Sequence, residues 1–519
     1  MATSTAELGS PTWLESLRAR LTPATAAARE TASSGGFYAL LVAASLALGA
    51  LSLLYPSTPT YDPWAWIVWG REIAHLDLHT TGGPSWKPLP VLFTTVFSVF
   101  GEASPNLWLV IARGGAVLSV LLAFSLAARL TGRRASVPAV VAGLVAAGAL
   151  LTSSGFVRTM TLGDSEGLLV AFVLWGVERH LDGRYRQAFV LGFLAGLLRP
   201  EVWLFLGLYG LWLLLIDRRA LWLVAGGFAL IPVLWFLPEL WGSGNIWRAA
   251  DRAQQPNSDS PAFAKHPFVE VLRDAWPLVI VPVRASAALA MALAAWAWLR
   301  RRQQGAVLAV GLLASAWLLL IAAMTQAGFS GNPRYIILGT SMFCVLGGVG
   351  VGRILQGVET GAARVAAPRF APLASIALVL LMALGTSHWT RPRVRIFRPL
   401  DRAMRYQAEL RYDLRDALAQ VGGAQALQSC GPVVAGKFSV PMVAWYLRVH
   451  TLKVGINPQP HGAVVAARTT NDPGLHPQPP QPYPPGYRRI AVVRTTTLYA
   501  TCTPTPPVGG RGAAPAVRR

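Results

Sequence analysis

The sequence predicts a polytopic α-helical membrane protein with a soluble α/β domain at its C-terminal end. Three observations lead to this fold class. Of the 519 residues, 53% are hydrophobic and 49 are glycine. Only 13% are charged, whereas soluble domains carry about 25%. The apolar residues form long runs separated by short arginine-containing loops, which is typical of membrane spans. This composition excludes a soluble enzyme, a disordered tail protein and a disulfide-rich secreted module.

The first predicted span covers residues 37–55, an uncharged run that nearly crosses the hydrocarbon core at about 1.5 Å per residue. Ten further apolar runs follow, so we expect about 11 spans in a transmembrane domain over 37–387. These runs are 107–130, 136–153, 166–179, 187–199, 201–216, 220–238, 275–299, 305–323, 335–352 and 370–387.

Arginines set the expected orientation, because positively charged loops remain in the cytoplasm. They precede the first span and recur in every second loop. We therefore expect the tail 1–36 in the cytoplasm, and not as a cleaved leader, since it has no apolar core. An odd number of spans places the region 388–519 outside, although this region is also arginine-rich. The net charge of +22 is thus interpreted as a topology signal, and no nucleic-acid partner is expected.

Two long segments are expected on the outer side. The loop 56–106 is rich in Trp, Pro and Gly, and its stretch 63–76 predicts a helix in the plane of the interface. The domain 388–519 is expected to contain an amphipathic helix over 399–420. Short strands are expected at 433–435, 442–447 and 490–493, with a loop over 456–487.

The region 388–519 also contains Cys430 and Cys502. Outside the cytoplasm thiols oxidise readily, so a disulfide between these residues is favoured over two free thiols. The third cysteine, Cys344, lies inside a predicted span, and three cysteines exclude a Cys-rich metal site.

Asp62 is the first catalytic candidate. It follows the first span within Thr60-Tyr61-Asp62-Pro63-Trp64. A carboxylate at the membrane boundary accepts a proton from a hydroxyl that is held within hydrogen-bond reach. The alternative is a helix cap, because Asp at the N-cap followed by Pro is a good start signal. A general base and a cap are compatible roles for one carboxylate.

Four basic residues are candidates for binding an anion at the same surface, because each interrupts or adjoins an apolar run near its outer end. Acidic and aromatic residues that follow these basic residues in the sequence are supporting candidates. The acidic residue just after the predicted helix 63–76 is another. The basic residues are Lys87, Arg158, Arg199 and Arg334, and the supporting residues are Asp77, Asp164, Glu166, Glu201 and Tyr335. The structural alternatives are a snorkelling lysine at position 87 and an ion pair between Arg158 and Asp164.

One carboxylate and several cations at the outer leaflet fit the chemistry of a lipid-linked sugar phosphate. Cations stabilise the phosphate as it leaves, and a carboxylate activates the incoming hydroxyl. Grooves between spans would hold the polyprenyl chain. The sequence has no evident Gly-rich nucleotide-binding motif, so a nucleotide sugar or ATP is disfavoured as the direct substrate.

These motifs, in this order, resemble those of the GT-C glycosyltransferases, in particular the lipid A aminoarabinose transferases and the dolichyl-phosphate-mannose-type family. The first outer loop of that family has Asp-Glu, a helix ending in Ala-Arg-Glu-Met, a Gly-Asp turn and Lys-Pro-Pro-Leu. The similar residues here are Asp62-Pro63, 64–73, Leu76-Asp77 and Lys87-Pro88-Leu89-Pro90. Arg158 to Asp164, Arg199-Pro200-Glu201 and Arg334-Tyr335 are similar to later family motifs, so the resemblance covers 37–350.

The resemblance implies a polyprenyl-phosphate-linked sugar as donor and an inverting transfer outside the cell membrane. The acceptor would be a cell-envelope glycan, a glycolipid or a protein. Asp62 would be the base, and Lys87, Arg158, Arg199 and Arg334 would surround the phosphate. The family's paired acidic residues are reduced here to Asp62 followed by Pro63, so a site without metal or other cofactor is expected.

The additional C-terminal domain is similar to those of actinobacterial arabinofuranosyl- and mannosyltransferases. Arabinofuranose, mannose, glucose and aminosugars all fit a site whose identifiable parts contact phosphate and hydroxyl groups. Two other classes of protein remain open. One is a flippase or transporter of lipid-linked glycans, which would place paired repeats and charges at the membrane midplane. The other is a non-catalytic scaffold of envelope biogenesis with a GT-C-like fold.

Overall fold

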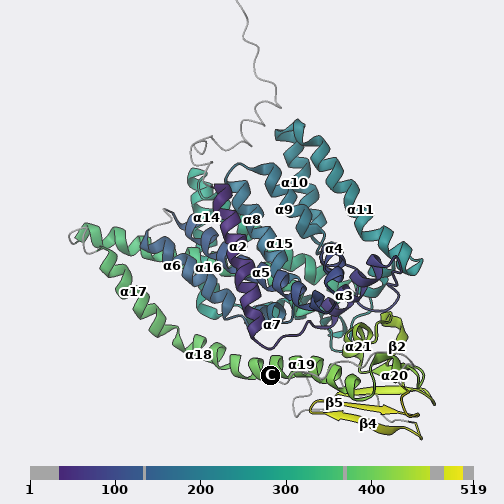
Figure 1. Cartoon of the computed structure of the whole chain (residues 1–519). Helices are drawn as coiled ribbons and strands as arrows, with labels where there is room; N and C mark the ends of the chain where they lie inside the picture. The colour runs from purple at the N-terminus through teal and green to yellow at the C-terminus, as the bar shows by residue number, and fades with distance from the viewer. Residues whose placement is uncertain (1–33, 133–135, 366–370, 468–483, 506–519) are drawn as a thin grey trace, which may run out of the picture.

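The computed structural model of the chain describes residues 34–132, 136–365, 371–467 and 484–505. A large bundle of helices forms most of the molecule, and a small mixed domain packs against one end of the bundle (Figure 1). The expected N-terminal tail lies outside the described residues, apart from its last three residues, which begin the first described helix.

The bundle and its connections consist of helices of very different length. They are α2 (Ser34–Leu51), α3 (Tyr61–Ala74), α4 (Pro88–Phe97), α5 (Ser104–Thr131), α6 (Val137–Leu151), α7 (Ser154–Thr161), α8 (Glu166–Leu181), α9 (Tyr185–Gly196), α10 (Val202–Ile216), α11 (Leu221–Ser243), α12 (Arg248–Ala253), α13 (Pro267–Ala275), α14 (Val281–Arg301), α15 (Gly305–Gln326), η6 (Pro333–Ile336), α16 (Ile337–Val365) and α17 (Ala371–Gly385).

Within the described residues, six helices are long and apolar enough to cross a membrane, or up to eight if each of two bent pairs is one span. One bent pair is α6 with α7, which meet at 67°. The sequence predicted about 11 spans, and much of the difference lies in the region of α8, α9 and α10. These helices have 16, 12 and 15 residues, fewer than the roughly 20 that one crossing requires.

Helix α16 lies in the middle of the bundle, where α5, α6, α14 and α15 pack against it. Two of its glycines permit very close packing. A Cβ atom at Gly348 would lie 2.2 Å from the carbonyl oxygen of Ala142, and one at Gly350 would lie 1.9 Å from that of Ser286. Any larger residue would therefore push α6 or α14 away. Because η6 leads directly into α16, this packing also fixes the backbone around Arg334.

Helix α3 forms where the sequence predicted an interfacial helix, and it is covered on all sides. Trp64, Trp66 and Trp69 are each at most 2% exposed. Helix α4 packs against α3 from the bundle, and α21 (Val440–Leu447) packs against it from the C-terminal domain. A helix that is apolar around most of its circumference is stable only when it is enclosed in this way.

The C-terminal domain contains a five-stranded sheet in the order β2-β1-β3-β5-β4, counted over the described residues. Strands β2, β1 and β3 are parallel, and β5 pairs antiparallel with both β3 and β4. The elements are α18 (Ser387–Arg395), α19 (Phe397–Gln420), α20 (Ala424–Gln428), β1 (Val433–Ala435), α21, β2 (Val454–Gly455), β3 (Ala463–Ala467), β4 (Arg488–Val493) and β5 (Thr496–Ala500).

The sequence predictions for this domain were partly right. The amphipathic helix at 399–420 and the strands at 433–435 and 490–493 are present as α19, β1 and β4. The strand predicted at 442–447 is wrong, because these residues form α21. Pro441 in the first turn fixes a helical φ, and a short apolar run does not by itself distinguish a helix from a strand. The loop predicted at 456–487 contains β3, and 468–483 lies outside the described residues.

Hydrogen bonds fix the C-terminal domain beside the loop 56–106. Arg411 on α19 donates to the carbonyl oxygen of Ser57 (3.3 Å) and to Oδ1 of Asn106 (2.9 Å). The Tyr55 hydroxyl, at the end of the first span, donates to Oδ1 of Asp401 at 2.7 Å. The loop 56–106 and the C-terminal domain therefore lie on the same side of the bundle (Figure 1).

Candidate functional site

Charged side chains from five segments meet next to the first turn of α3. We call this group the polar cluster. It includes Asp62 on α3, Lys87 directly before α4, Asp164 and Glu166 at the start of α8, Arg199 and Glu201 between α9 and α10, and Arg334 in η6. Each of these side chains is at most 18% exposed. The cluster therefore unites seven of the ten residues that the sequence analysis proposed for donor binding and catalysis.

Arg334 connects two carboxylates of the polar cluster. Its Nη2 lies 2.5 Å from Oδ2 of Asp62, and its Nη1 lies 3.1 Å from Oδ1 of Asp164. The turn at 162–165 is placed by two contacts to neighbouring segments. Thr60 N–H donates to the carbonyl oxygen of Leu162, and the Trp108 indole donates to that of Gly163. Asp62 and Asp164 thus share the guanidinium of Arg334, which lies far from both in the sequence.

Arg199 and Lys87 meet at Glu166. Arg199 Nη2 lies 2.5 Å from Glu166 Oε1, and Lys87 Nζ lies 3.8 Å from the same oxygen. Lys87 also donates to the Ser165 hydroxyl at 3.1 Å, and its ammonium lies over the Trp66 ring. These contacts hold both cations in buried positions.

Tyr335 and Glu201 complete the surroundings of Arg199. The Arg199 guanidinium stacks on the Tyr335 ring at 3.8 Å from its centroid, and Glu201 Oε1 lies 3.5 Å from Arg199 Nη1. The same ring also lies near Arg334. The Tyr335 ring therefore makes cation–π contacts with two of the three cations, Arg199 and Arg334.

The polar cluster contains three cations and four carboxylates. Burial raises the pKa of Asp164 to about 7, against the opposing effect of Arg334. Burial, together with the nearby charge of Arg199, lowers the pKa of Lys87 to about 8. Both residues lie in loops between spans. A proton on Asp164 brings the cluster close to neutrality, which is the state that a buried group of charges favours.

Some polar atoms of the cluster have unused hydrogen-bonding capacity. Among the described residues, Nε of Arg199 and Nε of Arg334 are buried donors without a partner, and Oε2 of Glu166 and Oε2 of Glu201 are buried acceptors without one. Unpartnered buried groups are rare in native structures and often occur at functional sites. The two guanidinium donors are suited to an oxyanion.

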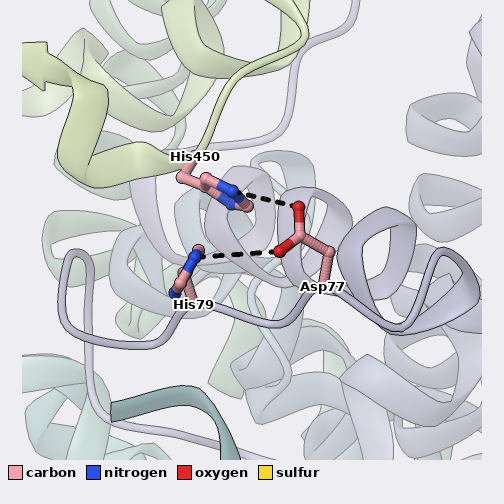
Figure 2. A group of neighbouring side chains, drawn as sticks. All are labelled: Asp77, His79 and His450. Atoms are coloured by element: carbon pink, nitrogen blue, oxygen red, sulfur yellow. Dashed lines mark ion pairs between the residues drawn. The ribbon is translucent and has the colours of Figure 1, made fainter.

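Two of the predicted residues do not join the polar cluster. Arg158, on α7, has an exposed side chain, and Asp164 pairs with Arg334. The Arg158–Asp164 ion pair considered in the sequence analysis is therefore not formed. Asp77 lies beyond the end of α3, between His79 and His450, as Figure 2 shows.

Other polar groups near the site were not singled out from the sequence. Glu239, at the end of α11, accepts from the Thr80 hydroxyl (2.8 Å) and from Arg248 Nη1 (3.1 Å). Arg248 also donates to the carbonyl oxygens of Gly83 and Pro84, so the pair supports the loop before Lys87. A lone carboxylate at the end of a long apolar run was the available signal for Glu239.

An apolar groove of about 420 Å³ lies between α2, α5, α7 and α19. Arg113 lies in it and donates to the carbonyl oxygen of Thr161 (2.7 Å), three residues before Asp164. Thr161 itself lines the groove, so the groove and the polar cluster are linked through the segment 161–164. Its lining residues are Leu48, Ser52, Tyr55, Arg113, Val117, Val157, Met160, Thr161, Phe397, Leu400, Asp401 and Met404.

The cysteines of the C-terminal domain form a disulfide between Cys430, after α20, and Cys502, after β5. Their separation of 72 residues means that the bond closes a loop around most of the sheet. Cys344 is free and buried in α16. The disulfide lies in the domain that the topology prediction places outside the cytoplasm.

No family model matches the chain, and no curated protein matches it. Among solved structures, the chain is similar to ArnT from Cupriavidus metallidurans bound to undecaprenyl phosphate. The sequences are 16% identical, the TM-score is 0.46, and the alignment covers 90% of this chain and 98% of that chain. It is also similar to ArnT from the same organism in the apo state. There the identity is 16%, the TM-score is 0.49, and the coverage is 91% and 99%. The alignments span nearly the whole chain.

Proposed function

We propose that this protein is a membrane glycosyltransferase that transfers a sugar from a polyprenyl-phosphate-linked donor to a cell-envelope acceptor. One observation carries the proposal. The carboxylate of Asp62 is held within a buried cluster that also contains the cations Lys87, Arg199 and Arg334. A carboxylate and cations in one enclosed site serve the two requirements of the reaction, which are a base for the acceptor and charge stabilisation for the leaving phosphate.

In the proposed reaction, an Asp62 oxygen takes the proton from an acceptor hydroxyl. The acceptor oxygen forms a bond to the anomeric carbon of the sugar while the bond from that carbon to the phosphate oxygen breaks. The electron pair leaves with the polyprenyl phosphate, and Lys87, Arg199 and Arg334 stabilise its charge. Attack from the face opposite the leaving group inverts the anomeric configuration.

Arg334 has two successive partners in this proposal. Without donor, its guanidinium is ion-paired with Asp62. A donor phosphate competes for the same guanidinium, whose Nε is unpartnered among the described atoms. Once Arg334 turns to the phosphate, the Asp62 carboxylate is released from this contact. Donor binding would therefore free the base for the acceptor hydroxyl.

The apolar groove between α2, α5, α7 and α19 is a suitable place for the polyprenyl chain. Half of its lining residues are Leu, Val and Met, and another, Thr161, lies directly before the turn that carries Asp164. The C-terminal domain packs its helix α21 against α3. This domain would then face the acceptor. Arabinofuranose, mannose, glucose and aminosugars all fit such a site as the donor sugar, because its identifiable parts contact phosphate and hydroxyl groups.

The catalytic step needs no metal in this proposal. Asp62 is followed by Pro63, so two adjacent carboxylates are not available at this position. The carboxylates around Asp62 already engage Arg199 and Arg334. The three cations of the cluster supply the positive charge that a metal ion would bring to the phosphate.

We also propose that the protein is a multi-pass protein of the cell membrane, with its N-terminus in the cytoplasm and the polar cluster at the outer surface. The Cys430–Cys502 disulfide supports this orientation, because such bonds persist in oxidising compartments. The donor lipid and the acceptor would then meet outside the cytoplasm.

The proposal is tested with the full-length protein in nanodiscs. Labelled polyprenyl-phosphate sugars that carry arabinofuranose, mannose, glucose or aminoarabinose are offered one at a time, with a crude envelope fraction as acceptor. Transfer from one donor is the expected result. Donor binding without transfer to any fraction would favour a non-catalytic scaffold. Movement of intact donor across proteoliposomes without transfer would favour a transporter, and no binding at all would overturn the donor class.

A further inference from the structure

A second group of polar side chains joins the first outer loop to the C-terminal domain. Asp77 and His79 follow the end of α3, and His450 follows α21 (Figure 2). We call these three residues the bridging cluster. His450 Nε2 lies 3.2 Å from Asp77 Oδ2, and His79 Nε2 lies 3.8 Å from Asp77 Oδ1. The two imidazole rings meet edge to face at 4.0 Å between their centroids.

A buried carboxylate fixes two members of this cluster. Glu72 is 4% exposed, and its Oε1 lies 2.8 Å from Nδ1 of His450. Its Oε2 accepts from the backbone N–H of His79 at 3.0 Å. An ionised carboxylate only accepts hydrogen bonds, so Nδ1 of His450 carries the proton. In the neutral imidazole, Nε2 then presents a lone pair toward the Asp77 carboxylate.

The arrangement therefore places two acceptors, Nε2 of His450 and Oδ2 of Asp77, 3.2 Å apart. Two acceptors at this distance repel unless a positive charge lies between them. A second proton on His450 is one such charge, and a metal ion is the other. The neighbouring Nε2 of His79 favours the metal, since the potential ligand atoms of all three residues lie within 4.8 Å of one another.

The spacing of these groups is close to that of a tetrahedral metal site. With metal–nitrogen and metal–oxygen bonds of about 2.0–2.1 Å, tetrahedral ligand atoms are about 3.3 Å apart. His450 Nε2 lies 3.2 Å from Asp77 Oδ2, which is close to this value. His79 Nε2 lies 3.8 Å from the other oxygen, Oδ1, and both side chains are exposed enough to move closer around an ion. Asp77 and His79 are 63% and 50% exposed, so an ion can enter and water can complete its coordination.

We propose that Asp77, His79 and His450 bind one zinc ion that fastens the C-terminal domain to the first outer loop. Two imidazoles and one carboxylate form a ligand set that suits zinc, with water in the fourth position. Glu72 acts as the partner of the His450 Nδ1–H, an arrangement that orients zinc-bound imidazoles in proteins. The contact is long-range, because His450 and Asp77 come from opposite ends of the sequence.

The neighbouring contacts show what such an ion would stabilise. Arg71, on the last turn of α3, donates to the carbonyl oxygens of Trp445 and Val449, directly before His450. The zinc ion would reinforce this junction between α3 and α21. It would also hold Trp445 and Tyr446 of α21 against Trp64 in the first turn of α3. It would lie at the other end of α3 from Asp62 and would not take part in the sugar transfer.

The test measures zinc itself and not activity. The tag-free full-length protein is purified in detergent, stripped with a chelator and titrated with zinc, followed by calorimetry and by elemental analysis after desalting. Cobalt substitution reports tetrahedral coordination through its visible spectrum. We expect one zinc ion per chain and a zinc-dependent rise in Tm. His79→Ala should abolish binding at concentrations that saturate the wild type, and Glu72→Gln should weaken it by roughly 10–100-fold.

The matched control is His75→Ala, since His75 is an exposed histidine at the end of α3 whose Nδ1 lies 2.8 Å from the Arg71 carbonyl oxygen. This variant should bind zinc like the wild type. Because the His79 side chain is half exposed, we expect His79→Ala to fold like the wild type. The test therefore does not depend on a His450 variant, which could fail to fold. Absence of zinc binding by the wild type would overturn the proposal. Equal binding by the wild type and His79→Ala would overturn it too.

Discussion

Nη2 of Arg334 lies 2.5 Å from Oδ2 of Asp62, although 272 positions separate the two residues in the sequence. This ion pair links η6, directly before α16, to the first turn of α3. The proposed base is thus held by one of the cations that would receive the leaving phosphate. In the proposed reaction, both residues exchange this contact for a contact to substrate.

Asp62→Asn should abolish transfer and leave the fold and donor binding intact. The amide cannot take a proton, so we expect kcat to fall by about 10²–10⁴-fold, the usual contribution of a general base. Arg334 keeps Asp164 as a partner and gains freedom to bind phosphate. The measurement is single-turnover transfer in nanodiscs. Asp259→Asn, which alters an exposed outer-loop carboxylate, is the control, and a normal rate for Asp62→Asn would remove Asp62 as the base.

Lys87→Met should weaken donor binding. The substitution keeps an unbranched side chain, one atom shorter, and removes the charge. A hydrogen bond to a charged group contributes about 1.5–3 kcal/mol. The Kd for the lipid-linked donor should therefore rise by about 10–100-fold. The exposed Lys265, in the outer loop before α13, provides the matched variant Lys265→Met, for which the Kd should not change. An unchanged Kd for Lys87→Met would place Lys87 outside the donor site.

Arg199→Ala should affect both donor binding and stability. The structure shows Glu166 and Glu201 buried around Arg199, and removal of one partner from a buried pair costs about 3–5 kcal/mol. We expect a large drop in Tm for Arg199→Ala and a smaller one for Arg199→Lys, which keeps the charge. Equal Tm values for the wild type and Arg199→Ala would contradict this view of the pair.

Donor binding should weaken as the pH rises from about 6 to about 8, because Asp164, with a pKa of about 7, becomes ionised beside Arg334. Deprotonation of Lys87, with a pKa of about 8, acts in the same direction. The raised pKa of Asp164 also stabilises the folded state at low pH, and this stability is lost as the pH rises through about 7. Asp164→Asn should bind donor with a shallower pH dependence. An equally steep profile in that variant would exclude Asp164 as its source.

Asp413→Ala should loosen the C-terminal sheet. Asp413 on α19 is fully buried and accepts from the Thr495 backbone N–H (2.8 Å), the Thr495 hydroxyl (2.7 Å) and Arg494 (2.8 Å). Loss of the acceptor leaves buried donors unsatisfied, at a cost of about 1–3 kcal/mol. Hydrogen exchange should accelerate across β4 and β5. Asp416→Ala, an exposed site on the same helix, should leave exchange unchanged, and a similar effect of both variants would refute the assignment.

The cations of the polar cluster were predictable from sequence, and their partners were not. Lys87, Arg199 and Arg334 interrupt apolar runs, and a charge in such a place needs a cavity or a counter-ion. Apart from Glu201, which lies two residues after Arg199, the counter-ions lie far away along the chain, and no local pattern pairs Arg334 with Asp62. His450 illustrates the same limit, because it meets Glu72 and Asp77 only when α21 packs on α3. The short run at 442–447 was misassigned since apolar runs of this length suit both a helix and a strand.

The glycines of α16 have a consequence for movement during the reaction. With Gly348 against the Ala142 carbonyl and Gly350 against that of Ser286, α16 cannot slide along α6 or α14 without steric overlap. Arg334 is joined to this helix through η6, so its backbone stays in place while its guanidinium exchanges partners. Side-chain torsions of this kind are intrinsically far faster than rigid-body helix shifts. Structures with and without donor should therefore superimpose along α16 and differ at the tip of a single arginine.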